Sequence, residues 1–205
     1  MTITIRDAAE QQLDSVLALN NAAGITILPL DMTRLRALAE QAAYFRIALV
    51  DGQIAGFLIA LRETAEYGSP NFQWFRAHYP QFLYIDRIVI ARPYRGLGLG
   101  RIFYADVTSF AEVRVPLLTC EVFLEPRDDA SVLFHGTYGF QEVGQQVMPG
   151  VDRRVSLLAK ELCSFPFVRD TYLHGPMGAL PNQPWLAERP RLFGAPSRAA
   201  AAHRA

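Results

Sequence analysis

Residues 85–101 have the sequence IDRIVIARPYRGLGLGR, in which an apolar strand, a proline-marked turn and a loop with alternating glycines follow one another. A helical pattern comes next, with apolar residues along one face from Ile102 to Ala111. A glycine-rich loop that enters a helix leaves backbone N–H groups unpaired and directed at one spot, where the helix dipole adds positive potential. Arg95 and Arg101 can add charged donors. The stretch therefore predicts a binding site for a phosphate group.

The glycine spacing excludes the common nucleotide-binding loops. A dinucleotide or kinase fingerprint needs glycine at its first, third and sixth positions, and the sixth residue counted from Gly96 is Arg101. A Walker loop needs a Gly-Lys pair, and the one lysine of the chain, Lys160, lies far away. The alternative that these glycines only form a tight turn between strand and helix stays open here.

The composition is typical of an ordinary folded domain. The chain has 205 residues, 51% hydrophobic and 20% charged, with a formal net charge of zero, so no broad basic surface favours nucleic acid. The two cysteines lie far apart and lack metal-ligand spacing, so we expect no metal and a reduced, cytoplasmic setting. We also expect no signal peptide and no membrane span.

The sequence on both sides of the glycine loop predicts alternating helices and strands. Before the loop we expect a strand over residues 2–6, helices over 10–21 and from Asp31 to about 43, and a hairpin of strands 45–50 and 54–61. After the loop we expect a strand over 117–124, a helix from Asp128 or Asp129 to Gly139, and strands over 141–148 and 153–161 joined by a turn at Pro149-Gly150. An aromatic-rich insertion lies between these two parts, over residues 62–81.

The residues after 162 have a different character. Prolines recur from Pro166 to Pro196 and exclude long regular elements, and the chain ends in alanine and arginine. We expect a domain over residues 1–162 and an extended appendage over 163–205, disordered at its end. Its aromatic residues can dock on the domain; they are Phe165, Phe167, Tyr172 and Trp185.

These features together resemble the GNAT acetyltransferase family. Its central pattern, Arg/Gln-x-x-Gly-x-Gly/Ala, is met by Arg95, Gly98 and Gly100. The hairpin sequence around Asp51-Gly52 and the pair Gly139-Phe140 are similar to two further landmarks of the family. The resemblance covers about residues 2–162. It implies an α/β (α+β) fold with a mixed, mostly antiparallel central sheet of about six to seven strands flanked by about four helices.

In this family the co-substrate is acetyl-CoA or another acyl-CoA. The resemblance implies that the strand residues Ile88, Val89 and Ile90 pair with the pantetheine arm as if it were an added strand. It also implies that the loop holds the pyrophosphate; the loop residues are Arg95, Gly96, Leu97, Gly98, Leu99, Gly100 and Arg101. On the second helix, Asp128 and Ser131 occupy the family positions next to the pantetheine, although the family more often has asparagine at the first.

His135 occupies the position of the tyrosine that often protonates the departing CoA thiolate in this family. A histidine can do the same as an imidazolium. The alternative is a packed histidine on the helix surface. Cys120 lies in an apolar run, so we expect it in the core and not as a nucleophile.

Asp86 is a candidate for the base that removes the proton of the amine. Strand alternation predicts its side chain on the same face as positions 88 and 90. The alternative is a buried ion pair with Arg87 or Arg92. Tyr84, on the same face, can relay a proton through water, and Glu121 is the other acid embedded in a strand.

The resemblance implies an N-acetyltransferase that moves an acetyl group from acetyl-CoA to a primary amine of a small molecule or peptide, by direct attack in a ternary complex. Residues 20–30 and 62–81 would frame the acceptor. A non-catalytic acyl-CoA-binding or regulatory module is the main alternative, and transfer to oxygen or to protein is a further one. We expect no nucleic-acid or membrane partner, and a homodimer is in keeping with the family.

Overall fold

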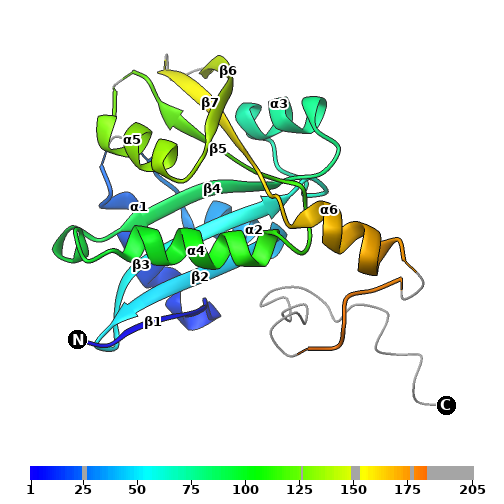
Figure 1. Cartoon of the computed structure of the whole chain (residues 1–205). Coiled ribbons are helices and arrows are strands. Elements are labelled where there is room, and N and C mark those ends of the chain that lie inside the picture. The colour runs from blue at the N-terminus through cyan, green and yellow to red at the C-terminus, as the bar shows by residue number, and fades with distance from the viewer. Residues whose placement is uncertain (25–26, 126, 149–152, 176–177, 184–205) are drawn as a thin grey trace.

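A mixed sheet of seven strands forms the centre of the computed structural model, which describes residues 1–24, 27–125, 127–148, 153–175 and 178–183. The strand order is β1-β2-β3-β4-β5-β7-β6, and every neighbouring pair is antiparallel except β4 and β5 (Figure 1). The expected mixed, mostly antiparallel α/β architecture is thereby confirmed. The strands are β1 (Ile3–Asp7), β2 (Ala42–Val50), β3 (Gln53–Arg62), β4 (Leu83–Ile90), β5 (Leu117–Phe123), β6 (Gln141–Met148) and β7 (Arg153–Glu161).

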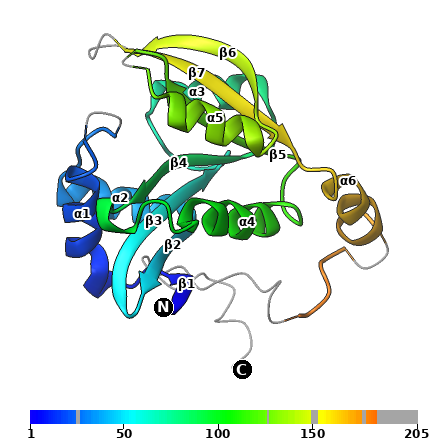
Figure 2. The ribbon, with the colours of Figure 1, turned by 60° about the vertical axis from the view of Figure 1, so that its left-hand side comes forward.

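Helices cover both faces of this sheet. Helices α1 and α2 lie against one face and α4 lies against the other (Figure 2). Within the described ranges the helices are α1 (Leu13–Asn21), α2 (Met32–Gln41), α3 (Pro70–His78), α4 (Leu99–Ala111), α5 (Asp129–Thr137) and α6 (Phe165–Val168). None of these helices is both long and apolar enough to cross a membrane.

Local sequence signals account for several element boundaries. Asp31 caps α2, because its carboxylate accepts a hydrogen bond of 2.8 Å from the backbone N–H of Arg34. Asp51 and Gly52, with φ of 47° and 83°, form the turn between β2 and β3, as a type I′ turn requires. Gly139, with φ of 78°, follows the end of α5.

The insertion between β3 and β4 contains a helix, α3. Pro70 occupies its first turn, where a missing N–H costs nothing. Phe72 and Phe75 are fully buried and pack with Tyr84 of β4. The aromatic residues of the insertion therefore serve largely to anchor α3 on the sheet.

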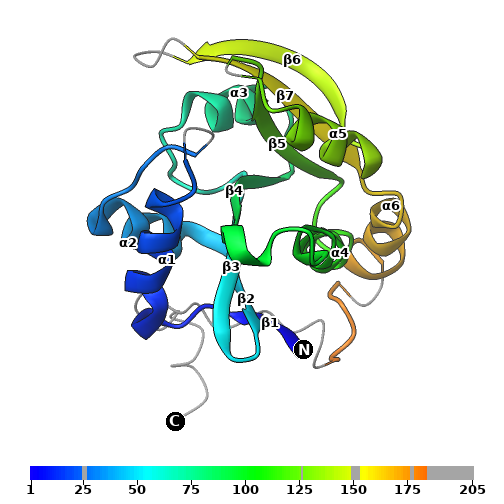
Figure 3. The same cartoon turned by 90° about the vertical axis from the view of Figure 1, so that its left-hand side faces the viewer.

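The pairing of β4 with β5 is short, and this decides where a cavity can form. The two strands pair only at Leu83 with Leu118 and at Tyr84 with Thr119. Past these residues β5 turns away from β4 and pairs with β7 along its other edge (Figure 3). Because this parallel ladder ends after two residue pairs, space remains between the two strands beyond them.

The expectation of an extended segment after residue 162 is wrong for residues 165–173, which form α6 and a single π-helical turn. Pro166 lies in the first turn of α6 and therefore does not break it. Phe165 is 3% exposed and joins the core next to α4, whereas Phe167 is 65% exposed. Trp185, the chain end and the turn at Pro149-Gly150 lie outside the described residues, and the division at residue 162 stays a prediction.

Gly56 of β3 generates a prediction about how β3 and β4 are held together. A Cβ atom there would lie 2.6 Å from the backbone oxygen of Val89 and 2.9 Å from a side-chain carbon of Ile90. Because the first neighbour is backbone, a rotamer change cannot relieve the clash. We expect Gly56→Ala to lower the free energy of unfolding by about 1–3 kcal/mol in urea denaturation. Gly68→Ala is the control, since a Cβ there meets nothing within 4 Å; equal effects of the two variants would contradict the prediction.

Candidate active site

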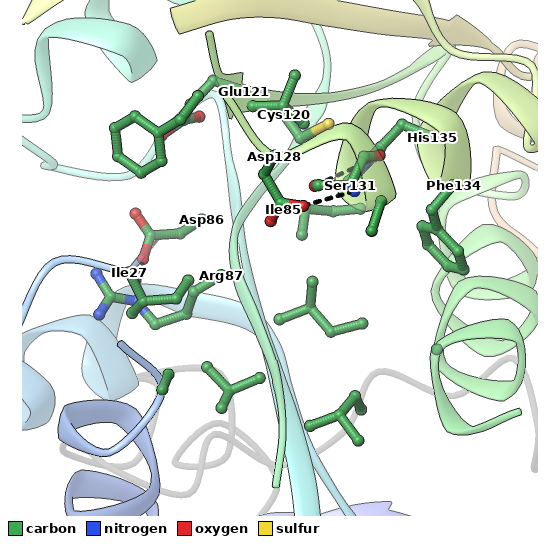
Figure 4. A pocket seen from close by; sticks show the side chains of 18 of the residues that line it. Ile27, Ile85, Asp86, Arg87, Cys120, Glu121, Asp128, Ser131, Phe134 and His135 are labelled. Atoms are coloured by element: carbon green, nitrogen blue, oxygen red, sulfur yellow. Dashed lines mark hydrogen bonds and ion pairs between the residues drawn. The ribbon is translucent and has the colours of Figure 1, made fainter. Parts of the chain in front are cut away.

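A cavity of about 510 Å³ lies where β4 and β5 diverge (Figure 4). Its wall combines β4, β5, the glycine loop and α5 with the connections that follow α1 and β3. Asp86, Arg87 and Glu121 lie on the same side as Ile27 in Figure 4, and His135 lies across β4. The divergence of the two strands therefore brings the predicted donor loop and the predicted acids to one space.

The glycine loop forms the entrance to α4. Gly96 and Gly98 have φ of 82° and 80°, and Gly98 is the N-cap of α4. A Cβ atom at either glycine would meet nothing within 4 Å, so the space beside both glycines is open. The first backbone N–H groups of a helix have no partner within the helix, and here they border that space. The Arg95 Nε atom donates to the Ile90 carbonyl oxygen at 3.2 Å and ties the loop to the end of β4.

The predicted donor residues divide into two groups. Those that line the cavity are Ile88, Val89, Ile90, Arg95, Gly96, Gly100, Asp128 and Ser131. Leu97, Gly98, Leu99 and Arg101 do not line it. Leu99 is 1% exposed and packs in the core, whereas Leu97 is 39% exposed. The loop therefore contributes Arg95, Gly96 and Gly100 to the cavity wall, and its leucine side chains lie elsewhere.

The edge of β4 that faces β5 is open along most of its length. Beyond Tyr84, no strand among the described residues pairs with this edge, although β3 pairs with the opposite edge as far as Ile90. Its N–H and C=O groups can therefore accept an extended ligand as an added strand. This edge leads from the glycine loop toward the interior of the cavity.

Asp128 caps α5, which follows β5 along the chain. Its carboxylate accepts a hydrogen bond of 3.0 Å from the backbone N–H of Ser131. An aspartate at this position therefore performs the capping that an asparagine side chain would perform equally well. Both residues line the cavity beside the open edge of β4.

His135 is buried on α5, with 5% of its surface exposed. Its Nδ1 atom lies 2.7 Å from the Ser131 carbonyl oxygen, and its Nε2 atom lies 2.5 Å from the hydroxyl oxygen of Tyr104 on α4. A carbonyl can only accept, so Nδ1 carries the proton and Nε2 accepts from Tyr104. Burial lowers the pKa of His135 and favours this neutral form. The imidazole therefore has no free proton for a ligand, although its ring lines the cavity.

Asp86 forms the buried ion pair that was the alternative to a catalytic role. One carboxylate oxygen lies 2.6 Å from the Nε atom of Arg87, and the other accepts from the Tyr67 hydroxyl at 2.6 Å. Arg87 also donates to the side chain of Asn20 at 2.9 Å. Both carboxylate oxygens of Asp86 are therefore occupied by partners within the protein.

The expectation that Asp86 shares a face with positions 88 and 90 is wrong, because a β-bulge interrupts the alternation of β4. In the pairing with β3, Ile59 lies opposite Arg87 and Ala60 lies opposite Ile85, so Asp86 is the extra residue. Ile85 and the residues at 88 and 90 belong to the core on the α4 side. The bulge directs Asp86 toward Tyr67 and Arg87 instead.

Glu121 of β5 is the acid best suited to accept a proton. The Tyr84 hydroxyl donates to its carboxylate at 2.6 Å. Burial raises the pKa of Glu121 to about 7, even though the hydrogen bond from Tyr84 lowers it. Burial and the charge of Glu121 also hold the pKa of Tyr84 well above its ordinary value, so Tyr84 remains a donor. From the sequence, Glu121 was predicted only as a second embedded acid, because the sequence of β5 alone reveals neither its burial nor its hydrogen bond with Tyr84 of β4.

Cys120 lies next to Glu121 and also lines the cavity. It is 2% exposed, and burial raises the pKa of its thiol well above the ordinary value. A buried thiol of this kind is a poor nucleophile, in agreement with its expected place in the core.

Comparison with known proteins gives a consistent result. The model of the acetyltransferase (GNAT) family matches residues 13–140. No curated protein matches the sequence. Among solved structures, the ribosomal-protein-S18-alanine N-acetyltransferase from Escherichia coli superposes with a TM-score of 0.60 at 17% identity, covering 78% of this chain and 94% of that one. Ard1 from Thermoplasma volcanium has a TM-score of 0.65 at 14% identity, covering 79% and 99%.

A third solved structure, the NatC complex bound to Gag peptide and CoA, has a TM-score of 0.62 at 15% identity, with 79% of this chain and 99% of that chain covered. At these identities the three structures show a shared fold. The family model covers more than half of the sequence, including the glycine loop, the open edge of β4 and α5. The chain belongs to the GNAT acetyltransferase family.

Proposed function

We propose that this protein is an N-acetyltransferase that transfers an acetyl group from acetyl-CoA to a primary amine in a ternary complex. The observation that carries the proposal is the open edge of β4, which joins the glycine loop to the cavity beside Glu121. The similar NatC complex was solved with CoA and a peptide, which supports a CoA thioester and an amine as the two substrates. Acetyl transfer to an amine is also the activity of the similar Escherichia coli enzyme.

The donor site fits a CoA molecule by its shape and its charge. Gly96 and Gly98 leave room for a pyrophosphate at the start of α4, where unpaired N–H groups and the helix dipole favour an anion. Backbone groups of Ile88, Val89 and Ile90 can bind the amides of the pantetheine, and Asp128 and Ser131 border the same path. The bound thioester supplies an electrophilic carbonyl carbon.

Glu121 is the proposed general base. Its pKa of about 7 makes a carboxylate available at neutral pH that still binds a proton with useful affinity. The transfer forms a C–N bond and breaks a C–S bond; the proton of the amine passes to Glu121, directly or through water, and the electron pair of the C–S bond stays on sulfur. Tyr84 positions the carboxylate through its hydrogen bond and is itself no base. Asp86 serves to hold Arg87 and Tyr67 in this proposal.

The role of His135 in protonating the thiolate stays a prediction. Its Nε2 atom accepts from Tyr104, so a neutral His135 would position Tyr104 and the wall of the cavity, while water can supply the proton to sulfur. The non-catalytic alternative predicts tight acetyl-CoA binding without acceptor-dependent thiol release. The homodimer and the cytoplasmic location also stay predictions.

Acetyl-CoA binding tests the donor site. We expect Gly98→Asp to abolish binding in isothermal titration calorimetry, because a carboxylate would enter a site built for an anion. Gly98→Asn is the matched control, since asparagine has the same shape, tolerates a positive φ and carries no charge. It should retain measurable affinity, and unchanged affinity in Gly98→Asp would exclude the loop as the pyrophosphate site.

The pH dependence of the rate tests the base. We expect kcat/KM of the parent enzyme to rise with pH through a midpoint of about 7, as Glu121 loses its proton. Glu121→Gln should lower kcat/KM by about 10²–10⁴-fold and remove this midpoint. Tyr84→Phe should keep the base but move the midpoint to higher pH, because it removes a hydrogen bond that favours the carboxylate. An unchanged profile in Glu121→Gln would assign the base elsewhere.

The same carboxyl group predicts a pH-dependent stability. The pKa of Glu121 is raised from 4.5 to about 7 in the folded state, so folding loses stability as pH rises between these two values. Glu121→Gln removes this loss. We expect its gain in Tm over the parent to be larger at pH 8 than at pH 4.5, by roughly 2–4 °C or more in differential scanning fluorimetry. A gain that is equal at both pH values would show that the folded-state pKa of Glu121 is not raised.

A further inference from the structure

The acceptor side of the cavity has an apolar wall. The residues that form it come from the connection after α1, the connection after β3, and the ends of β5 and β6; they are Ala23, Ile27, Leu28, Tyr67, Phe123 and Met148. Ile27 is labelled beside the Asp86–Arg87 pair in Figure 4. An acceptor that reaches Glu121 must therefore pack an apolar group against these side chains.

The positive charge on this side is already neutralised. Among the described residues that line the cavity, the guanidinium groups are those of Arg87 and Arg95. Arg95 is bonded to the end of β4 at the glycine loop. Arg87 has 7% of its side chain exposed; its Nε atom donates to Asp86, and its Nη1 atom donates to Asn20 and to the Leu28 carbonyl oxygen.

Arg153 is the remaining cation to consider near this wall. Its guanidinium carbon lies 5.1 Å from the centre of the Phe123 ring, and Arg153 is not part of the cavity lining. The residues that adjoin the wall residues in the sequence, 25–26 and 149–152, include no lysine, arginine or histidine. Among the described residues of the lining, the acceptor side thus presents the Glu121 carboxylate and one cation, Arg87, which is paired with Asp86; it offers no second cation for an acceptor carboxylate.

We propose that the acceptor is a primary amine attached to an apolar group and without a carboxylate on the carbon that bears the amine. This inference rests on the proposed acetyl transfer and narrows its substrate. A free amino acid would place its carboxylate beside that of Glu121 without a compensating charge, because Arg87 is already paired with Asp86, and that arrangement is unfavourable in a partly buried site. A decarboxylated amine, or an amine whose neighbouring carboxyl group is blocked as an amide, avoids this cost.

Matched acceptor pairs test the inference. Thiol release from acetyl-CoA is measured with phenethylamine against phenylalanine, and with isoamylamine against leucine, each rate being normalised to the neutral-amine fraction at the assay pH. We expect kcat/KM at least about tenfold higher without the carboxylate, as one unfavourable charge contact implies. Phenylalaninamide is included to distinguish the two kinds of acceptor that lack this carboxylate, a simple amine and an amine next to an amide group. If kcat/KM for phenylalaninamide equals or exceeds that for phenethylamine, the natural acceptor is a peptide-like amine. If kcat/KM for phenylalaninamide is lower, the natural acceptor is a simple amine.

The outcomes of the panel separate this inference from the proposed function. Turnover of phenylalanine and leucine at rates equal to or above those of the amines would overturn the inference and leave acetyl transfer intact. An absence of thiol release with every acceptor, in protein that binds acetyl-CoA, would overturn the proposed function and this inference with it.

A variant with an added positive charge tests whether amino acids are disfavoured because their carboxylate lacks a compensating cation. Ile27 is partly buried in the acceptor wall, outside the sheet and the donor site. Ile27→Arg should provide an uncommitted guanidinium and raise the ratio of kcat/KM for phenylalanine to that for phenethylamine by about tenfold. Ile27→Gln, a neutral polar control of similar length, should leave the ratio near that of the parent. An unchanged ratio in a folded Ile27→Arg protein with parental acetyl-CoA affinity would contradict exclusion by charge.

Discussion

The parting of β4 and β5 after two residue pairs is the constraint on which the rest of the structure depends. If the ladder continued, the backbone of β4 would be paired with β5, and no cavity could form between the two strands. Because the ladder stops, the edge of β4 is open to another extended molecule, and Glu121 on the departing strand lines the cavity between the two strands. The glycine loop, the start of α4 and the cap of α5 then gather at the same opening.

Asp86 and Glu121, two of the acidic residues that line the cavity, show how different surroundings give two carboxylates different roles. Asp86 is neutralised by Arg87 and bonded by Tyr67, so its charge is used to hold the connection that follows β3 against β4. Glu121 accepts a hydrogen bond from a hydroxyl group and is buried, and burial raises its pKa to about 7. The desolvation that makes it a candidate base also makes it unfavourable for folding when ionised. This opposition between stability and reactivity is what a general base in a protein interior requires.

Features that depend on neighbouring residues in the chain could be predicted from the sequence, whereas features that depend on partners from distant elements could not. Asp51-Gly52, Asp31 and Gly139 determine a turn, a helix start and a helix end by their own conformations, and the order of the elements was predicted from such signals. The face of Asp86 was predicted wrongly because a bulge depends on how β4 pairs with β3. The satisfied state of His135 depends on Tyr104, which lies 31 positions earlier on another helix. The helical course of residues 165–173 was missed because proline was taken as a breaker, although the first turn of a helix accepts it.

The short β4–β5 ladder also determines how the two halves of the sheet are joined. It is the one direct strand-to-strand link, in the described part of the chain, between the half of the sheet that contains β1 to β4 and the half that contains β5, β7 and β6. The hydrophobic core under α4 is another connection, because it contains residues of β2, β3 and β4 together with residues of β5 and β7. A molecule bound along the open edge of β4 would therefore extend the contact between the two halves beyond the two residue pairs of the ladder.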